Sequence, residues 1–215
     1  MSARRFILAS ASPRRRALLR AAGIAADVMP ADLDDTTVPW RGAAPAAWAM
    51  AMAWFKARRV ASALRMRGEL GAGDAGEVAE PPGALWIIAA DTLCDLDGGI
   101  IGKPADEEAC RATLRAFRSR AHRVHTGVAL FEPKRSRRHV IVDSSTVLLG
   151  DLDDRAIEEY VAEGAWRGKA GGYNFDERVA AGWPLRCLGD PTTVTGLPMR
   201  LLARTLAADA PSEAA

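Results

Sequence analysis

Apolar runs alternate along this chain with segments whose apolar positions recur every three or four residues. Residues 6–9 predict a short strand, and residues 85–90 predict a strand that is covered on both faces and ends at Asp91. Residues 45–67 combine helical periodicity with arginines near the carboxyl end, which predicts a long helix. Its apolar side is expected to contain Trp48, Met52, Phe55, Val60 and Leu64.

The rest of the chain continues this alternation. Five elements are predicted from periodicity and turn residues: a return strand at 100–101 after a turn at 97–99, a helix from about 106 to 117, paired strands at 121–132 and 138–149, and a helix near 153–163. Residues 168–173 form a glycine-rich loop, residues 178–189 are ambiguous, and residues 196–198 begin the last helix. Ala26 to Met29 predict one further short strand.

Two segments lack such a pattern. Residues 68–84 are rich in glycine and acidic residues, so we expect a flexible surface insertion that carries no chemistry. The segment 207–215 contains mainly alanine, proline and glutamate and predicts a disordered tail. Residues 1–206 are therefore expected to form a single domain, with room for two lobes that share a cleft.

Charge and cysteine content limit the possible partners. The chain has 29 basic and 27 acidic residues, a balance too even for a general nucleic-acid or membrane-surface binder. Its three cysteines, Cys94, Cys110 and Cys187, share no metal-binding spacing and are expected to be small buried side chains in a reducing compartment. Without a secretory segment or membrane-length apolar run, the sequence predicts a soluble cytoplasmic protein with neither nucleic-acid nor membrane partners.

The first predicted helix begins with an unusual concentration of positive charge. Residues 12–13 predict its N-cap and first position, and arginines occupy positions 14–16. The helix dipole disfavours cations in this first turn by roughly 0.3 to 1 kcal/mol each. Free backbone N–H groups, Ser10 and forked guanidinium groups would favour a bound phosphate here, and a solvated basic helix end explains the sequence equally well.

One aspartate follows a predicted buried strand. Asp91 suits either a divalent-cation ligand near phosphate oxygens or a general base, although a helix cap or a turn would also explain a single aspartate. A metal site becomes plausible only if Asp91 meets Asp34 or Asp35.

Lysines are scarce, with only four in the chain. Lys56, Lys103 and Lys169 adjoin small, apolar or turn-forming residues, and a compact ammonium group suits a phosphate oxygen. Surface solvation is the simpler interpretation of each lysine. His122 and His125 would point to opposite faces of a strand, so a shared metal is not expected. Neither a P-loop, a dinucleotide-binding fingerprint nor a nucleophilic triad signature occurs.

Six short motifs occur in order and at compatible spacings: SASPRR at 10–15, ADT at 90–92, GKP at 102–104, HRVHTGVAL at 122–130, KAGGY at 169–173 and GLP at 196–198. Together they resemble the Maf family of nucleoside triphosphate pyrophosphatases from about residue 6 to 206. The resemblance implies an α/β fold with an elongated, mixed, twisted sheet flanked by helices, two lobes around a deep cleft, and often a homodimer. It also implies hydrolysis between the α- and β-phosphates of a nucleotide with Mg²⁺ or Mn²⁺.

The resemblance assigns roles to individual positions. The implied residues are Ser10, Arg14 and Arg15 for phosphate binding, Asp91, Lys56 and Lys103 for catalysis, and Asp35 and Asp91 for the metal. Asp35 occupies a position that is usually glutamate. Thr92 resembles the subgroup that acts on dTTP and UTP, since the 7-methyl-GTP subgroup usually has glutamine there.

Two positions depart from the family pattern. Gly168 replaces an aspartate, and Asp176, here expected to bind substrate, stands where an active-site glutamine is usual. A carboxylate in place of an amide adds an acceptor-only charge near phosphate. Two alternatives therefore stay open: a non-catalytic nucleotide-binding regulator of septation, and a pyrophosphatase for another base, such as 7-methyl-GTP, CTP or ITP.

Overall fold

The computed structural model describes residues 4–33, 40, 42–70 and 84–209. The strands are β1 Arg5–Leu8, β2 Asp27–Val28, β3 Leu85–Leu96, β4 Gly99–Ile101, β5 Arg120–Glu132, β6 Arg137–Leu149 and β7 Leu185–Leu188. The helices are α1 Pro13–Ala21, α2 Pro45–Met66, α3 Glu107–Phe117, α4 Asp154–Glu163, α5 Phe175–Ala180, α6 Pro191–Thr195 and α7 Met199–Ala208, with a 3₁₀ turn, η2, at Ala170–Gly172.

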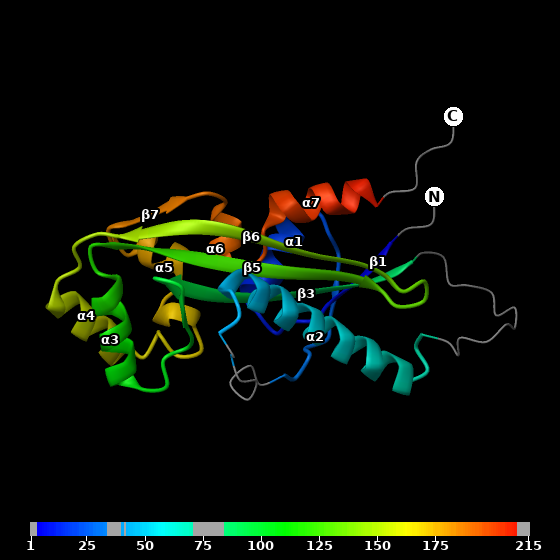
Figure 1. The fold of residues 1–215 in the computed structure, drawn as a ribbon, viewed down its shortest axis with the longest axis horizontal. Helices are drawn as coiled ribbons and strands as arrows, with labels where there is room; N and C mark the ends of the chain where they lie inside the picture. The colour runs from blue at the N-terminus through cyan, green and yellow to red at the C-terminus, as the bar shows by residue number, and fades with distance from the viewer. Residues whose placement is uncertain (1–3, 34–39, 41, 71–83, 210–215) are drawn as a thin grey trace, which may run out of the picture.

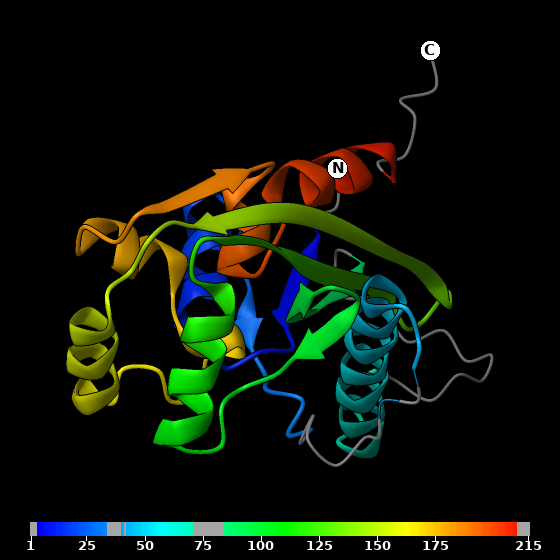
Figure 2. The ribbon, with the colours of Figure 1, turned by 60° about the vertical axis from the view of Figure 1, so that its left-hand side comes forward.

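The described strands form one mixed sheet of seven strands in the order β2-β1-β3-β5-β6-β7, with β4 paired to β3. Strands β1, β2 and β3 are parallel, whereas β3, β5, β6 and β7 pair antiparallel. The long hairpin β5–β6 runs along the molecule and gives it an elongated shape (Figure 1). Its strands curve and twist strongly in the turned view (Figure 2), as expected for a sheet of L-residues. The α/β prediction and the mixed, twisted sheet are confirmed.

Both faces of β3 are covered, which explains its continuous apolar run. Ile87 and Ala89 pack toward α2 on one face, and Trp86 and Ile88 pack toward α1 and α7 on the other. In Figure 1, α2 lies below the strands and α7 lies above them. Alternate side chains of one strand thus supply two separate cores.

Helix α2 buries several alanines together with three of the five side chains predicted for its apolar side, Met52, Val60 and Leu64. Its fully buried positions include Ala49, Ala53 and Ala57, and a Cβ atom on Gly127 of β5 would lie 2.3 Å from the Ala49 carbonyl oxygen. This close approach leaves no room for a large residue. The prediction that Phe55 is buried is therefore wrong, because 51% of this residue is exposed on the opposite side of the helix.

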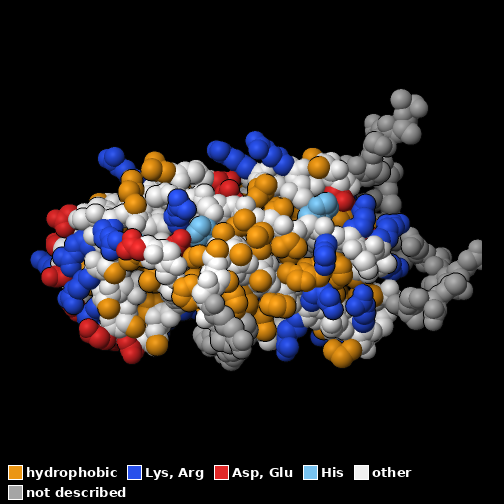
Figure 3. Space-filling view, in the orientation of Figure 1, with side chains coloured by type: hydrophobic (Ala, Val, Ile, Leu, Met, Phe, Trp, Pro, Cys, Tyr) orange, Lys and Arg blue, Asp and Glu red, His pale blue; other side chains and the backbone are white. Residues whose placement is uncertain are grey.

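The hydrophobic side chains gather over the middle of the face that carries α2, whereas charged side chains of both signs mix at the end formed by α3 and α4 (Figure 3). Ion pairs join these two helices: Arg111 Nε lies 2.7 Å from Glu158 Oε2, and Arg118 Nη2 lies 2.6 Å from Asp154 Oδ1. Exposed pairs of this kind contribute little to stability. The two helices are held mainly by the hydrophobic core beneath them.

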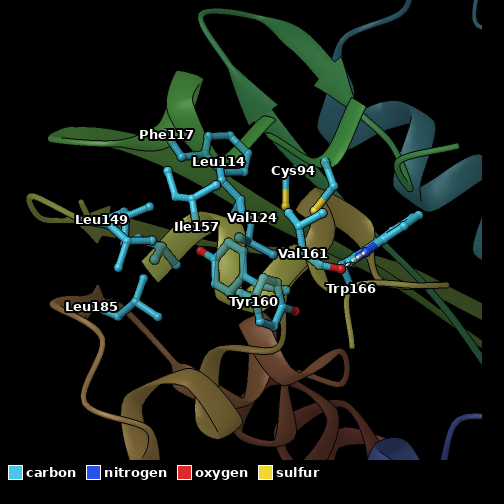
Figure 4. Packing of buried hydrophobic residues seen from close by; sticks show 14 residues of the cluster. Cys94, Leu114, Phe117, Val124, Leu149, Ile157, Tyr160, Val161, Trp166 and Leu185 are labelled. Carbon is cyan, nitrogen blue, oxygen red and sulfur yellow. Dashed lines mark hydrogen bonds between the residues drawn. The ribbon is translucent and has the colours of Figure 1, made fainter. Parts of the chain in front are cut away.

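Beneath α3 and α4 lies a third core (Figure 4). Its aromatic members Phe117, Tyr160 and Trp166 are nearly fully buried, and Cys94 and Cys110 pack with them as free thiols. The prediction of small buried cysteines is confirmed for these two, whereas Cys187 is only partly buried. This core and the two cores beside β3 lie along the same sheet, so a single framework connects the two halves of the molecule.

The sequence predicts that the strand ends at Asp91, but β3 continues past this residue. Pairing with β5 continues from Ile87 opposite Phe131 to Asp95 opposite Arg123, so Asp91 lies in the middle of the strand. A polar residue is usually read as a strand end, but backbone hydrogen bonds to β5 do not depend on side-chain polarity. The local sequence therefore misplaced this boundary.

The C-terminal third also differs from the prediction. The ambiguous segment contains the end of α5 and all of β7, and the short helix α6 precedes the predicted last helix. Helix α7 extends through Ala208, beyond the predicted start of the tail, and Asp209 lies 3.1 Å from Arg137 and 3.0 Å from His139. Most of the predicted insertion lies outside the described residues. None of the described helices is both long and apolar enough to cross a membrane.

Candidate active site

A cavity of about 560 Å³ opens beside the middle of β3. Strand β1 pairs with β3 only as far as Ile88, and β4 pairs with it only from Cys94 onward. Within the described part of the chain, no strand covers this edge of β3 between those two points. Because Asp91 and Thr92 lie on this open edge and point to opposite faces of the sheet, both side chains can border one cavity.

Arg15, in the first turn of α1, is held by oxygen atoms from three separate segments. Its Nε donates to the Gly196 carbonyl at 2.8 Å, its Nη1 to Ser10 Oγ at 3.0 Å, and its Nη2 to Thr92 Oγ1 at 3.0 Å. These acceptors help to offset the unfavourable position of a cation at a helix N-terminus. The forked guanidinium matches them because its donors diverge in one plane.

The start of α1 forms as predicted, with Ser12 as the N-cap accepting a hydrogen bond from Arg15 N at 3.4 Å. The three arginines of this turn have different surroundings. Arg15 points inward to its acceptors and lines the cavity together with Arg14, whereas Arg16 is exposed. The sequence treated them as one basic cluster, whereas the fold separates two arginines that line the cavity from one that is exposed.

Lys56 and Asp91 form an ion pair at the side of the cavity next to α2. Lys56 Nζ lies 2.6 Å from Asp91 Oδ1, and only 12% and 11% of the two side chains are exposed. The small alanines of α2 allow the helix to approach β3 closely enough for this contact. Asp91 Oδ2 has no hydrogen-bond partner among the described residues, so this oxygen can accept a further ligand.

The glycine-rich loop forms the opposite wall. Gly171 has a φ angle of +67°, and a Cβ atom there would lie 2.7 Å from Cys94 Sγ. Tyr173 OH is 2.8 Å from His122 Nε2, and the His122 ring stacks on Phe117 with centroids 3.9 Å apart. Burial lowers the pKa of His122 to about 4, so the imidazole is neutral near pH 7. Close packing and this buried hydrogen bond hold the middle and the end of the loop.

The wall formed by the glycine-rich loop also contacts the GKP segment. Gly171 N donates to the Gly102 carbonyl at 2.9 Å, which places the exposed Lys103 beside the glycine-rich loop. Lys169 Nζ lies 2.5 Å from Glu177 Oε2, so this lysine is paired with a carboxylate of α5. Of the lysines singled out from the sequence, all three line the cavity.

Most of the residues predicted for the site line this one cavity: Ser10, Arg14, Arg15, Lys56, Asp91, Thr92 and Lys103. Asp176 is not among the lining residues, and its Oδ2 accepts a hydrogen bond from Thr195 Oγ1 at 2.8 Å. Asp35 lies outside the described residues. Gly168, which stands in place of an aspartate, does line the cavity.

Sequence reasoning missed several residues with a part in this site. Asp32 lines the cavity, and so do Tyr173, the last residue of the glycine-rich loop, and Asn174, which follows it. The buried Thr126 contacts Thr92 from the next strand. In the sequence, Thr126 stands out only as part of the HRVHTGVAL motif, and the motif does not indicate which residue Thr126 contacts.

The carboxylates that line the cavity in the described part of the chain are Asp32 and Asp91. No group of three or more His, Cys, Asp or Glu side chains in that part could by itself hold a metal ion. The two predicted strand histidines have separate contacts, His122 with Tyr173 and His125 with Ser144 at 2.7 Å. Magnesium is commonly bound by one or two carboxylates together with substrate phosphates, and this set of oxygen donors fits that pattern.

Comparison with known proteins identifies the family to which this arrangement belongs. The family model described as Maf-like protein matches residues 5–208. The chain is a member of the Maf family. Its Maf domain therefore spans all described strands and helices, including both walls of the cavity.

Curated relatives of this Maf protein carry the name dTTP/UTP pyrophosphatase. The one from Salinibacter ruber is 39% identical over 202 residues, which cover 94% of this chain and 89% of that protein. The one from Chelativorans sp. is 35% identical over 206 residues, covering 95% and 91%. The one from Pelotomaculum thermopropionicum is 36% identical over 200 residues, covering 93% and 94%.

Proposed function

We propose that this Maf protein hydrolyses the bond between the α- and β-phosphates of a nucleoside triphosphate, releasing the monophosphate and pyrophosphate, with dTTP or UTP as its substrate. One observation carries the proposal: the basic start of α1 borders the same cavity as the ion pair between Lys56 and Asp91. The two residues of this pair are 35 positions apart in the sequence. The cavity volume of about 560 Å³ is in the range of small-molecule sites. The names of the relatives support the substrate class.

The basic residues bind and orient the triphosphate. Arg14, Lys56 and Lys103 line the cavity from α1, α2 and the GKP segment and can contact phosphate oxygens from several sides. Arg15 presents a guanidinium whose orientation is held by oxygens of the protein. Positioned cations stabilise the negative charge that develops on the leaving pyrophosphate.

Asp91 positions the attacking water. Lys56 holds Asp91 Oδ1 at 2.6 Å, which keeps the carboxylate in one orientation and leaves Oδ2 as the oxygen that can contact the water. A carboxylate within hydrogen-bond distance of water can orient it and accept its proton. Because β3 is paired with β5 on its other edge, Asp91 sits on a rigid strand rather than on a mobile loop.

A divalent cation, Mg²⁺ or Mn²⁺, belongs to this proposal. Asp91 would hold it together with Asp35, as the family resemblance implies, and with oxygens of the substrate. When bound, the cation supplies neutralisation of the triphosphate charge. The protein is also expected to form a homodimer and to work in the cytoplasm, as the sequence analysis predicted.

A binding-only regulator is the other candidate from the sequence, suggested by Asp176 in place of glutamine. Asp176 does not line the cavity and is hydrogen-bonded to Thr195, so no repulsion between this carboxylate and the phosphates follows from its position. The retained Lys56–Asp91 pair favours the enzyme.

The test is the release of pyrophosphate and monophosphate from dTTP, UTP, CTP, 7-methyl-GTP and ITP with Mg²⁺ or Mn²⁺. We expect turnover of dTTP or UTP and a loss of at least about 1000-fold in Asp91→Asn, which keeps the shape of the side chain but cannot accept a proton. Thermal unfolding confirms that the variant is folded. Tight triphosphate binding by calorimetry without any product from the wild-type protein would instead establish the binding-only regulator.

A further inference from the structure

Thr126 is a fully buried polar residue in β5 that does not line the cavity. It lies opposite Thr92 of β3 in the strand register. The two hydroxyl oxygens are 2.8 Å apart, and Thr126 Oγ1 donates to the Thr193 carbonyl at 2.7 Å. Thr92 Oγ1 in turn accepts from Arg15 Nη2 at 3.0 Å. A continuous chain of hydrogen bonds thus leads from the arginine to a buried hydroxyl and on to α6.

The direction of each hydrogen bond in this chain follows from counting protons. A hydroxyl group has one hydrogen, and a carbonyl oxygen can only accept. Because Thr126 gives its hydrogen to the Thr193 carbonyl, it must accept the hydrogen of Thr92. The Thr92 hydroxyl is then committed away from the cavity, and its oxygen faces Arg15 as an acceptor.

The same short helix holds Arg15 at a second point. The Gly196 carbonyl, directly after α6, accepts from Arg15 Nε at 2.8 Å, while the Thr193 carbonyl within α6 ends the chain through Thr126. Thr193 Oγ1 also donates to Asp143 Oδ2 of β6, which ties α6 to the sheet. The orientation of the guanidinium is therefore linked to the placement of α6 on strands β5 and β6.

We propose that Thr126 is a positioning residue for Arg15: through Thr92 it fixes the orientation of the guanidinium toward the triphosphate, although it contacts no substrate itself. This proposal rests on the proposed function. It also gives Thr92 a specific role, as an acceptor for the arginine rather than a donor to the nucleotide. Without the Thr126 hydroxyl, the hydrogen of Thr92 is released to other acceptors and Arg15 loses a fixed partner.

Three variants separate this role from an ordinary contribution to the core. Thr126→Val keeps the shape and removes the hydroxyl, and Thr126→Ser restores the hydroxyl. Ser145→Ala is the matched control, because Ser145 is also buried in the sheet and donates to an α6 N-cap carbonyl, that of Asp190, at 2.9 Å; it helps to hold α6 but takes no part in the hydrogen-bond chain from Arg15 through Thr92 to Thr126. Both removals are expected to lower the free energy of unfolding by a similar amount.

For the preferred nucleotide we expect Thr126→Val to lower kcat/KM by about 10-fold, Thr126→Ser to recover most of it, and Ser145→Ala to stay within about twofold of wild type. In an Arg15→Lys background, Thr126→Val should lower kcat/KM almost no further, because the guanidinium that Thr126 positions is already absent. An equal effect of Thr126→Val in both backgrounds, or an equal loss of activity in Ser145→Ala, would overturn the proposal.

A binding measurement distinguishes failure of this proposal from failure of the proposed function. The affinity of the folded variants for inorganic tripolyphosphate is measured by calorimetry, which needs no turnover. We expect Thr126→Val to weaken this affinity by about 10-fold and Ser145→Ala to leave it unchanged. If the wild-type protein binds tripolyphosphate but hydrolyses no nucleotide, the proposed function fails while this comparison still tests Thr126. If Thr126→Val and wild type bind equally, or if wild type does not bind, the positioning role is wrong.

Discussion

The wall of the cavity around Arg15 and the wall formed by the glycine-rich loop face the same space but are held in different ways. Around Arg15, directional hydrogen bonds between side chains and carbonyls set the orientation of the guanidinium. In the opposite wall, close packing of Gly171 on Cys94 and stacking of His122 on Phe117 set the position of the loop.

Hydrogen bonds thus set the orientation of a side chain in one wall, and packing sets the position of the backbone in the other. A hydrogen-bond network can lose one donor and leave the fold intact, since each net bond contributes only about 1 kcal/mol. A packed wall cannot accept an added atom without a shift of its neighbours. Changes in the polar wall should therefore act first on activity, and changes in the packed wall should act first on stability.

The largest expected effect is on activity, from Arg15→Lys in the polar wall. Lysine keeps the charge but cannot donate to Gly196, Ser10 and Thr92 from one planar group. We expect kcat/KM to fall by about 100- to 1000-fold, roughly 3 to 4 kcal/mol of transition-state stabilisation. Steady-state kinetics with the preferred nucleotide measure this. Arg16→Lys, on the exposed side of the same turn, is the control and should stay near wild type. A kcat/KM of the Arg15→Lys variant within threefold of wild type would refute the role of the Arg15 guanidinium.

The next effect is on stability, from Gly171→Ala in the packed wall. The variant adds a Cβ atom 2.7 Å from Cys94 Sγ at a backbone position with a φ angle of +67°. Strain and overpacking together should lower the free energy of unfolding by about 2 to 3 kcal/mol. Gly182→Ala has a similar φ angle of +83° with open space around it, so it isolates the strain, at about 1 kcal/mol. Urea denaturation compares the two, and equal losses would show that packing on Cys94 does not matter.

The smallest effect is a pH dependence of stability that arises from His122 in the packed wall. Burial lowers its pKa in the folded state to about 4 from the usual 6.5, so the folded protein binds this proton more weakly than the unfolded chain. Stability is then complete above pH 6.5 and decreases as pH falls from there toward 4, by about 1 kcal/mol between pH 7 and 5.5.

His122→Gln replaces this group with a side chain that does not titrate and can still reach the Tyr173 hydroxyl. The difference in unfolding free energy between pH 7 and 5.5 should be smaller in this variant than in wild type by about 1 kcal/mol. Urea denaturation at the two pH values measures this difference. Identical pH slopes in the two proteins would mean that His122 does not carry the dependence.

Much of the secondary structure could be predicted from the sequence, because the determinants are local. The Ser12 cap, the residues of α2 and the two strands of the β5–β6 hairpin were predicted to within a few residues. Helix periodicity, capping groups and turn residues act over three to five positions, so they can be read from a short window. The motifs that identify the family are equally visible in the sequence.

The errors occurred where long-range contacts override the local pattern. Phe55 was predicted to be buried from its periodicity, but close packing of α2 on Gly127 selects the alanine side of the helix. Asp91 was predicted to end a strand, but pairing with β5 extends the strand past it. Both outcomes depend on partners more than 30 residues away.

The sequence by itself determined most of the elements and the family, and most of the site residues that it predicted line the cavity. Only the tertiary structure decided how these residues act on one another: that Arg15 meets Gly196, 181 residues away, and that Thr126 completes the chain of hydrogen bonds behind it. The physical reason is that hydrogen-bond orientation depends on the exact placement of acceptors from several elements, which no single segment encodes.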